Sequence, residues 1–535
     1  MASQHIQVAT PPSKDAILES LVENVRACNA RLPPGRDKIV FGACELEAEM
    51  PLLLNPGPGA PLPCREPPAE SETVNAHFSA QMHAFFNALY DLEDMADKPS
   101  SDDLDLCRPD ECLRPVICVS NQSFEPHLDC LHRAFHTRRL TVQNPDSLPL
   151  LNRVTQLRIL PDRDSTFDPI NMRPVSLRTP LELATRLPQL RELDCPWLWE
   201  RLPVAFTSKA LRIISRVWAG PWRDDRAEFA RAVRHAMPLL PSSLTKVRLW
   251  FWRPSSHWDE MDQAAQMPDL VGASSSSSTN EFEGMDPVSL GLRDLGSRLE
   301  ELDVCALITP DLFPSGGGGL SWPHIRHLNV EFHPCAPDGS WYFSGPRGED
   351  PHATGFAITR EEHYPPGQED DDETHELMSD EEEEYQGDAP DIYDLRNPDM
   401  FRLRPIAERI NPLLLAFASS LQRQKIPALR DAELFTWLTW RPSKERAKEY
   451  EGSDDVPPTS YEEETVMFRW GVRYEAPAVG GDGKGKVTWQ VGEDWRPEDG
   501  VIKAFKDLVG GDGENMEWKA FEFVEEREQD PEDYI

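Results

Sequence analysis

A short pattern that recurs along the middle of the chain constrains the fold more than any other feature. In its first copy Val154 is followed by Leu157 and Ile159, and further copies begin at residues 190, 244, 299, 325 and 429. The apolar and polar residues that alternate at the end of each copy predict a short strand with one buried face. The leading apolar residue would fill the corner where the chain turns into that strand. This arrangement is typical of a leucine-rich repeat.

Apolar stripes at helical spacing lie upstream of several copies. We expect one helix before the copy at 244 and one before the copy at 429, the second interrupted at Asn411-Pro412. The stripe residues are Trp222, Phe229, Val233 and Met237, and Ile406, Ile410, Leu413, Phe417 and Leu421. Prolines just before four of the strands, at positions 188, 241, 323 and 427, mark where a helix must stop. Helix and strand in alternation predict a parallel sheet with helices on its outside.

The spacing of the copies is irregular. They begin between 26 and 104 residues apart, whereas ordinary repeats span ~20–29 residues. We therefore expect long insertions, one Ser-rich (272–283) and the largest (333–400) containing an acidic tract (367–394). The expected fold class is α/β, an irregular leucine-rich-repeat-like array over residues 146–460.

The flanking regions differ from this array. Residues 1–145 carry apolar stripes at helical spacing and predict a helical N-terminal region, with a Pro-rich linker at 51–70. Residues 461–535 predict a small C-terminal α+β module of two strands, a helix and a last strand, followed by an acidic tail, or else a cap on the end of the array.

Net charge and cysteine usage limit the classes of partner and the cellular compartment that we expect. The chain has a formal net charge of −38, which repels nucleic-acid phosphates and anionic membranes and attracts a basic partner protein. We therefore expect no nucleic-acid partner and no membrane partner. The ten Cys residues form no Cys-x-x-Cys pair, and neither a secretory signal nor an apolar run of ~18 residues is present. A cytoplasmic or nuclear protein with reduced thiols is expected.

The chain contains no motif that identifies a reaction. A nucleophile elbow, a His-Glu-x-x-His zinc motif and a phosphate-binding loop are all missing from the sequence. The Cys and His residues between 107 and 136 have spacings that fit no familiar zinc pattern. We therefore expect no catalytic residues, no cofactor and no metal site, and a protein that is not an enzyme.

The densest local signature is the segment 331–352, for which three interpretations stay open. The first is an ordered loop that packs its aromatic side chains over the repeat strands. The second is a recognition loop whose partner-binding residues are His333, Asp338, Trp341, Tyr342 and Arg347. The third is an enzyme pocket, which would add Glu362 and His363.

A candidate phosphorylation site lies in the acidic tract. Ser379 precedes an aspartate and four glutamates, the sequence context of an acidophilic kinase site. Phosphate there would deepen the negative charge of the tract.

Four phrases of the sequence resemble a family of filamentous-fungal proteins grouped with F-box and leucine-rich-repeat-like proteins. They are Cys195–Pro203, Gly220–Arg226, Leu249–Pro254 and Glu331–Gly348, and the resemblance covers roughly residues 140–475. An F-box would imply a substrate adaptor that binds a Skp-type component of a ubiquitin ligase. The Leu-Pro pairs at 32–33 and 62–63 lack the apolar helix that should follow, so any F-box here is degenerate. The first expectation remains a non-enzymatic protein–protein interaction scaffold.

Overall fold

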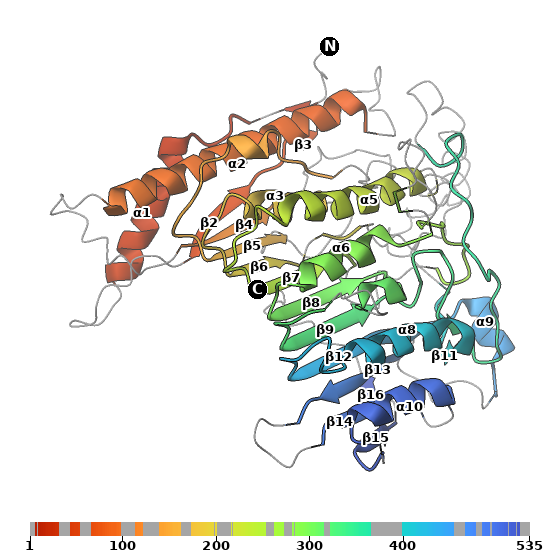
Figure 1. Ribbon diagram of the computed structural model, residues 1–535. Helices are drawn as coiled ribbons and strands as arrows, with labels where there is room; N and C mark the ends of the chain where they lie inside the picture. Colours follow the sequence, from red (N-terminus) through yellow and green to blue (C-terminus); the bar gives the residue numbers. More distant parts are fainter. Residues whose placement is uncertain are drawn as a thin grey trace, which may run out of the picture. The chain divides into compact units, whose positions relative to one another are not determined.

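The fold is a mixed α/β arrangement of mostly parallel strands with helices beside them, seen in a computed structural model (Figure 1). The chain divides into two compact units. The first runs to Leu198 and includes Arg234–Leu249, and the second comprises Trp199–Val233 and the chain from Trp250. The described residues are 6–7, 9–30, 43–53, 66–97, 113–120, 139–161, 173–196, 198–200, 216, 218–252, 262–271, 281–282, 284–314, 321–364, 399–453, 466–477, 484–492, 495–511, 513–520 and 522–524.

The first unit contains parallel strands in the order β2, β4, β5, β6 and β7. Their bounds are Ala43–Ala48, Arg114–Val119, Gln156–Pro161, Glu192–Cys195 and Lys246–Trp250. Its helices are α1 (Lys14–Ala30), α2 (Pro68–Asp97) and α3 (Thr179–Ala184), and η2 (Pro145–Ser147) is a single 3₁₀ turn. A two-residue strand, β1 (Ile6–Gln7), pairs antiparallel with β3 (Leu52–Leu53).

The second unit begins with three parallel strands, β8 (Glu301–Ala306), β9 (His327–Phe332) and β12 (Asp431–Trp440). Antiparallel partners follow, β13 (Val466–Glu475) and β14 (Lys486–Gln490), and then β15 (Met516–Lys519) and β16 (Glu522–Val524) at the edges. The helices are most of α5 (Ala219–Ala236), then α6 (Pro287–Gly296), α8 (Ala407–Ser420), α9 (Lys444–Glu449) and α10 (Asp499–Leu508), with the 3₁₀ turn η3 (Pro310–Leu312). Short strands β10 (Phe343–Ser344) and β11 (Arg404–Pro405) pair with each other.

All six copies of the sequence pattern form strands where they were predicted, namely β5, β6, β7, β8, β9 and β12. The leading apolar residue of each copy is buried, from Val154 at 0% exposed to Leu429 at 9%. β9 and β12 pair side by side although their copies begin 104 residues apart. The long insertion therefore leaves the sheet after β9 and returns before β12.

The N-terminal region is not only helical. Both predicted helices are present as α1 and α2. However, residues 1–145 also contribute the strands β2 and β4, and β4 pairs with β5 in parallel register. The sequence does carry the apolar spacing of the repeat at both places, as Leu113, Val116 and Cys118 for β4 and as Phe41, Cys44 and Leu46 for β2. These two copies were overlooked.

Two further expectations are corrected at the C-terminal side. Helix α8 continues through Pro412, which we expected to interrupt it. Pro412 leaves the carbonyl of Glu408 without its helical donor, and Glu408 is an exposed residue whose carbonyl water can reach. The predicted last strand near 518–524 is two strands, because β15 pairs with β14 and β16 pairs with β13.

The C-terminal module contains the predicted order of two strands, a helix and a strand. However, its first strand, β13, is not separate from the strands that carry the repeat copies. It pairs with β12 over ten residues, so this module continues the strands that carry the repeat copies.

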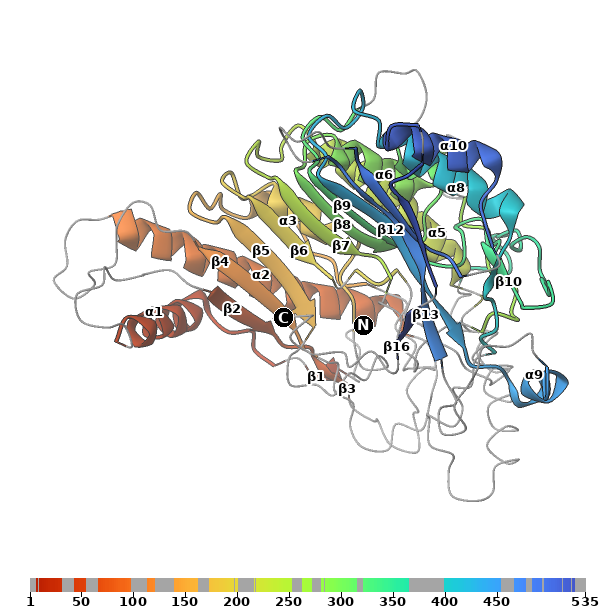
Figure 2. The same cartoon turned by 90° about the horizontal axis from the view of Figure 1, so that it is seen from below.

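One face of the second unit's strands is apolar and packs against the helices. A row of inward side chains runs in register across five strands, through Val304, Val330, Leu434, Val472 and Trp489, and each is at most 2% exposed. The Trp489 ring contacts Phe505 of α10, with ring centroids 4.7 Å apart. In Figure 2 the helices α6, α8 and α10 lie on this same side of the strands. Because side chains alternate along a strand, the intervening residues point to the opposite side.

Candidate binding surface

The opposite face of β8, β9 and β12 carries ionisable side chains in register. We call it the polar face, and its residues are Glu301, Asp303, His327, Asn329, Glu331, Asp431 and Glu433. The strand register pairs Asp303 with Asn329 and Asn329 with Glu433. A second row pairs Glu301 with His327 and His327 with Asp431. These outward positions contain five carboxylates and neither Lys nor Arg.

Local hydrogen bonds hold the polar face in place. The amide of Asn329 donates to Asp303 over 3.1 Å, and His327 Nδ1 lies 2.7 Å from Asp431 Oδ2. On the next strand, β13, Arg469 bonds Glu433 at 2.7 Å. These side chains are partly exposed, for example 38% at Asp431 and 20% at Glu433. The surface is therefore negative at β8, β9 and β12 and becomes mixed at β13.

The corresponding positions in the first unit form a closed charge network. Asp194 on β6 accepts from Arg158 of β5 at 2.9 Å and from Arg248 of β7 at 2.6 and 2.8 Å. Its side chain is only 6% exposed. A carboxylate that is held by two guanidiniums has little capacity left for a partner.

A buried ion network lies in the second unit beside the helices. The Arg226 guanidinium on α5 donates to Glu200 and to Asp286, each at 2.5 Å, and to the carbonyl of Leu307 at 3.1 Å. All three ionised side chains are 0% exposed. Asp286 also caps α6 by accepting the Ser289 N–H at 2.8 Å. Burial raises the pKa of Glu200, whereas its contacts with Arg226 and Trp222 act in the opposite direction.

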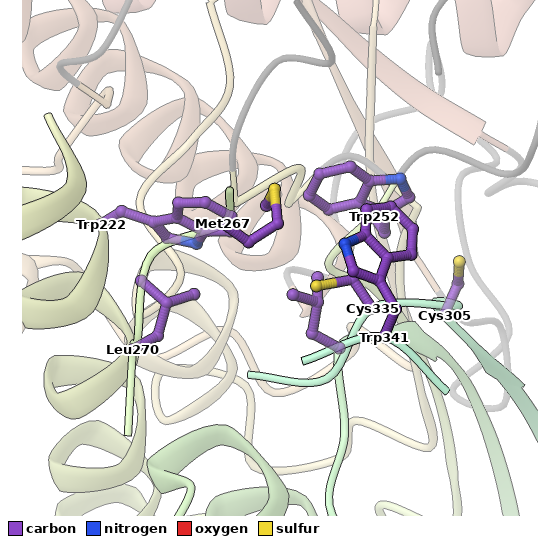
Figure 3. Packing of buried hydrophobic residues seen from close by; sticks show 8 residues of the cluster. Trp222, Trp252, Met267, Leu270, Cys305, Cys335 and Trp341 are labelled. Carbon is purple, nitrogen blue, oxygen red and sulfur yellow. The ribbon is translucent and has the colours of Figure 1, made fainter. Parts of the chain in front are cut away.

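The segment that follows β9 belongs to a hydrophobic cluster of the second unit. Figure 3 shows Trp222, Trp252, Met267, Leu270 and the neighbouring rings and thiols packed together. Trp341 and Cys335 come from the predicted loop and are at most 1% exposed. A tight turn at Gly339 (φ +77°) brings the loop against Gly355, where a Cβ would come within 2.5 Å of that Cα. The interpretation as an ordered, aromatic-packed loop therefore matches the packing.

Three of the five predicted partner-binding residues are buried. His333 is 4% exposed, Trp341 1% and Tyr342 4%. The Tyr342 hydroxyl donates to the carbonyl of Ile308 at 2.8 Å. Aromatic residues of this kind were expected to anchor an interface, but here they complete the core.

The other two predicted residues are exposed. Asp338 accepts hydrogen bonds from the backbone and hydroxyl of Ser340, at 2.9 and 2.6 Å. Arg347 lies over the Tyr450 ring, with Cζ 4.1 Å from the ring centroid, and donates to Ser453 at 3.1 Å. Their role in partner binding stays a prediction.

The structure places the remaining pocket candidates in separate surroundings. His363 is buried, stacks on Phe356 and accepts the Thr359 N–H at 2.9 Å, while Glu362 is exposed. His333 instead contacts Trp252 and Trp341.

Several predictions fall on residues outside those described. They include Ser379, the whole acidic tract and most of the Ser-rich insertion. Of the Cys and His residues between 107 and 136, only Cys118 is described; it is buried and its thiol donates to Glu45 at 3.2 Å.

The sequence reasoning missed the buried arginines. Arg226 lies on the same helical stripe as Trp222 and Phe229, four residues after the first and three before the second. A charged residue on an apolar stripe indicates a buried ion pair, so the signal was present. Arg402 has no such signal, because its neighbours in the fold are far away in sequence.

Comparisons with protein-family models, curated proteins and solved structures gave no match for this chain. Among the described residues, no group of three or more His, Cys, Asp or Glu is arranged to hold a metal ion. None of the described helices is both long enough and apolar enough to cross a membrane.

Proposed function

We propose that this protein is a non-enzymatic interaction scaffold and that its leucine-rich-repeat-like strands bind a basic segment of a partner protein on the polar face. The observation that carries the proposal is the registered rows of carboxylates on β8, β9 and β12. The apolar rows behind them fix these strands against the helices. A rigid row of like charges binds an oppositely charged segment without reordering its own backbone.

Two features support the repeat-like interpretation. Each of the six copies has a buried inward face, and its corner residue is buried. The first unit places Asp194 between two arginines, whereas the registered positions of β8, β9 and β12 bring together five carboxylates and neither Lys nor Arg. This difference favours the second unit as the binding part.

Affinity purification of the full chain with mass spectrometry tests the proposal when charge-swap variants are included. The test variant carries Glu331→Lys, Asp431→Lys and Glu433→Lys. The matched control carries Glu408→Lys, Asp499→Lys and Asp507→Lys, three exposed acids on the helices α8 and α10. Both variants change the net charge equally, and the test variant in addition removes the Glu433–Arg469 and Asp431–His327 contacts.

We expect a basic partner that the wild type and the control retain and that the test variant loses. Equal retention by all three proteins would contradict the polar face as the binding surface. Recovery of a Skp-type linker protein would instead favour the ubiquitin-ligase adaptor that the sequence resemblance implies.

A further inference from the structure

Three buried hydrogen-bond donors of the second unit, one on Trp341 and two on its neighbours, lack acceptors among the described residues. They are the Nε2 of His333, the Nε1 of Trp341 and the Nη2 of Arg402, and none has a partner among the described residues. The His333 and Trp341 ring centroids are 6.0 Å apart, and the Arg402 Cζ is 5.0 Å from the Trp341 ring centroid. Buried polar groups are almost always hydrogen-bonded, so three such donors beside one ring indicate a missing acceptor.

The tautomer of His333 follows from its backbone contact. Its Nδ1 accepts the N–H of Cys335 at 2.9 Å. A neutral imidazole that accepts at Nδ1 carries its proton on Nε2. Burial lowers the pKa of His333 to about 3, so the ring is neutral at physiological pH. The free nitrogen is therefore a donor, like the other two.

Charge at this place is also unbalanced. Arg402 and Arg409 both bind the same carboxylate, Asp350, each at 2.7 Å. The Nε and Nη1 groups of Arg402 also donate to the backbone carbonyls of Gln263 and Phe343. Two cations share one anion, which leaves one positive charge in excess. The nearby acid Asp338 is exposed and engaged with Ser340.

We propose that His333, Trp341 and Arg402 form a buried binding site for a small monoanion with oxygen acceptors, of the size of formate or acetate. Its oxygens accept the three unpaired N–H groups, and its charge balances the surplus guanidinium. The donors come from the loop after β9 and from the segment just before α8. The anion thus ties together two segments between which the acidic insertion lies in sequence.

Indole N–H resonances of the full chain, labelled with ¹⁵N at tryptophan, report directly on Trp341. The Trp341→Phe variant identifies its resonance. Titration uses sodium acetate and sodium formate, against sodium chloride at equal ionic strength. We expect the Trp341 resonance to shift and saturate with a carboxylate and to stay in place with chloride.

Trp489 provides the matched control within the same spectrum. Its indole N–H is also buried and lacks an acceptor among the described residues, but it stands between the rings of Phe505 and Trp518 rather than beside a guanidinium. Its resonance should not follow the carboxylate titration. Equal shifts of both resonances would show a general salt effect and overturn the site.

Arg402→Lys keeps the positive charge but removes the Nη2 donor, and we expect at least about tenfold weaker carboxylate binding. If this variant does not fold, His333→Phe removes the second donor with little change in shape and carries the same expectation. A Trp341 resonance in the wild type that ignores both carboxylates would overturn the proposal and leave ordered water as the occupant.

Discussion

The two buried clusters around Arg226 and Arg402 differ in how each buried guanidinium is paired with acceptors. The guanidinium of Arg226 meets two carboxylates and a carbonyl, so each of its nitrogens has an acceptor. Arg402 shares its single carboxylate with Arg409 and retains an unpaired nitrogen beside two further unpaired donors. In the first cluster every guanidinium donor has an acceptor within the chain, whereas in the second an acceptor from outside the chain would be needed. A buried charge is thus a structural tie in one place and a candidate binding site in the other.

The largest effect is expected from Arg226→Met. Removal of this cation leaves two carboxylates buried without their partner, which should lower the free energy of unfolding by about 3–5 kcal/mol. Urea denaturation measures it. Arg231→Met on the same helix is the control, because the pair of Arg231 with Glu281 is more than one-third exposed and should contribute at most about 1 kcal/mol. Similar decreases in the free energy of unfolding of the two variants would contradict a stabilising role of the buried Arg226 network.

A smaller loss is expected from Arg402→Met. Asp350 keeps Arg409 as its partner, so the change leaves mainly the carbonyls of Gln263 and Phe343 without a donor. Each unpaired buried acceptor costs about 1–3 kcal/mol, but no buried carboxylate loses its only cation, and removal of the surplus positive charge offsets part of the cost. In urea titrations without added carboxylate, this variant should therefore be more stable than Arg226→Met. If Arg402→Met were instead less stable than Arg226→Met, the Arg402 cluster would contribute more to the stability of the fold than the Arg226 cluster.

His333→Phe tests the cluster around Arg402 through the pH dependence of the free energy of unfolding. The pKa of His333 is lowered to about 3 in the folded chain, while an unfolded histidine titrates near 6.5. Between pH ~3 and ~6.5 His333 is protonated in the unfolded state but neutral in the folded state. The free energy of unfolding therefore falls as the pH drops below ~6.5, by up to ~1.4 kcal/mol per pH unit from this residue. The variant should lose that slope relative to wild type. Trp341→Phe, which removes a donor but no titratable group, should keep it.

The smallest effect on stability is expected on the polar face. Glu433→Gln weakens a pair with Arg469 in which both side chains are about one-fifth exposed. The free energy of unfolding should change by no more than about 1 kcal/mol, measured by urea denaturation. A loss as large as that of the buried variants would show that Glu433 has a structural role and would contradict the polar face as a binding surface.

The strands that carry the repeat pattern could be predicted because their signal is local. Leu157 and Ile159 alternate with polar neighbours, and the same alternation recurs in the other five copies. The strands β2 and β4 were missed although Leu113, Val116 and Cys118 have the same spacing as the six recognised copies, so their signal was also local. Helix α8 was predicted to break at Pro412, but packing of Ile410 and Leu413 in the core stabilises the helix on both sides of it. Tertiary contacts override local propensity at such places.

The loop after β9 shows why the candidate site was predicted only in part. Its aromatic and ionisable residues drew attention in the sequence, yet composition cannot tell an interface anchor from a core residue. Trp341 and Tyr342 have the chemistry of either, and only their burial decides the matter.

The sequence by itself determined the repeated strands, their apolar face and the uneven charge of the chain, because each depends on neighbours within a few residues. The tertiary structure alone decided which charges are neutralised. Arg226 meets Asp286 across 60 residues, and Arg402 meets Gln263 across 139. Whether a buried cation is satisfied depends on how many acceptors the fold brings to it, and no local pattern records that number.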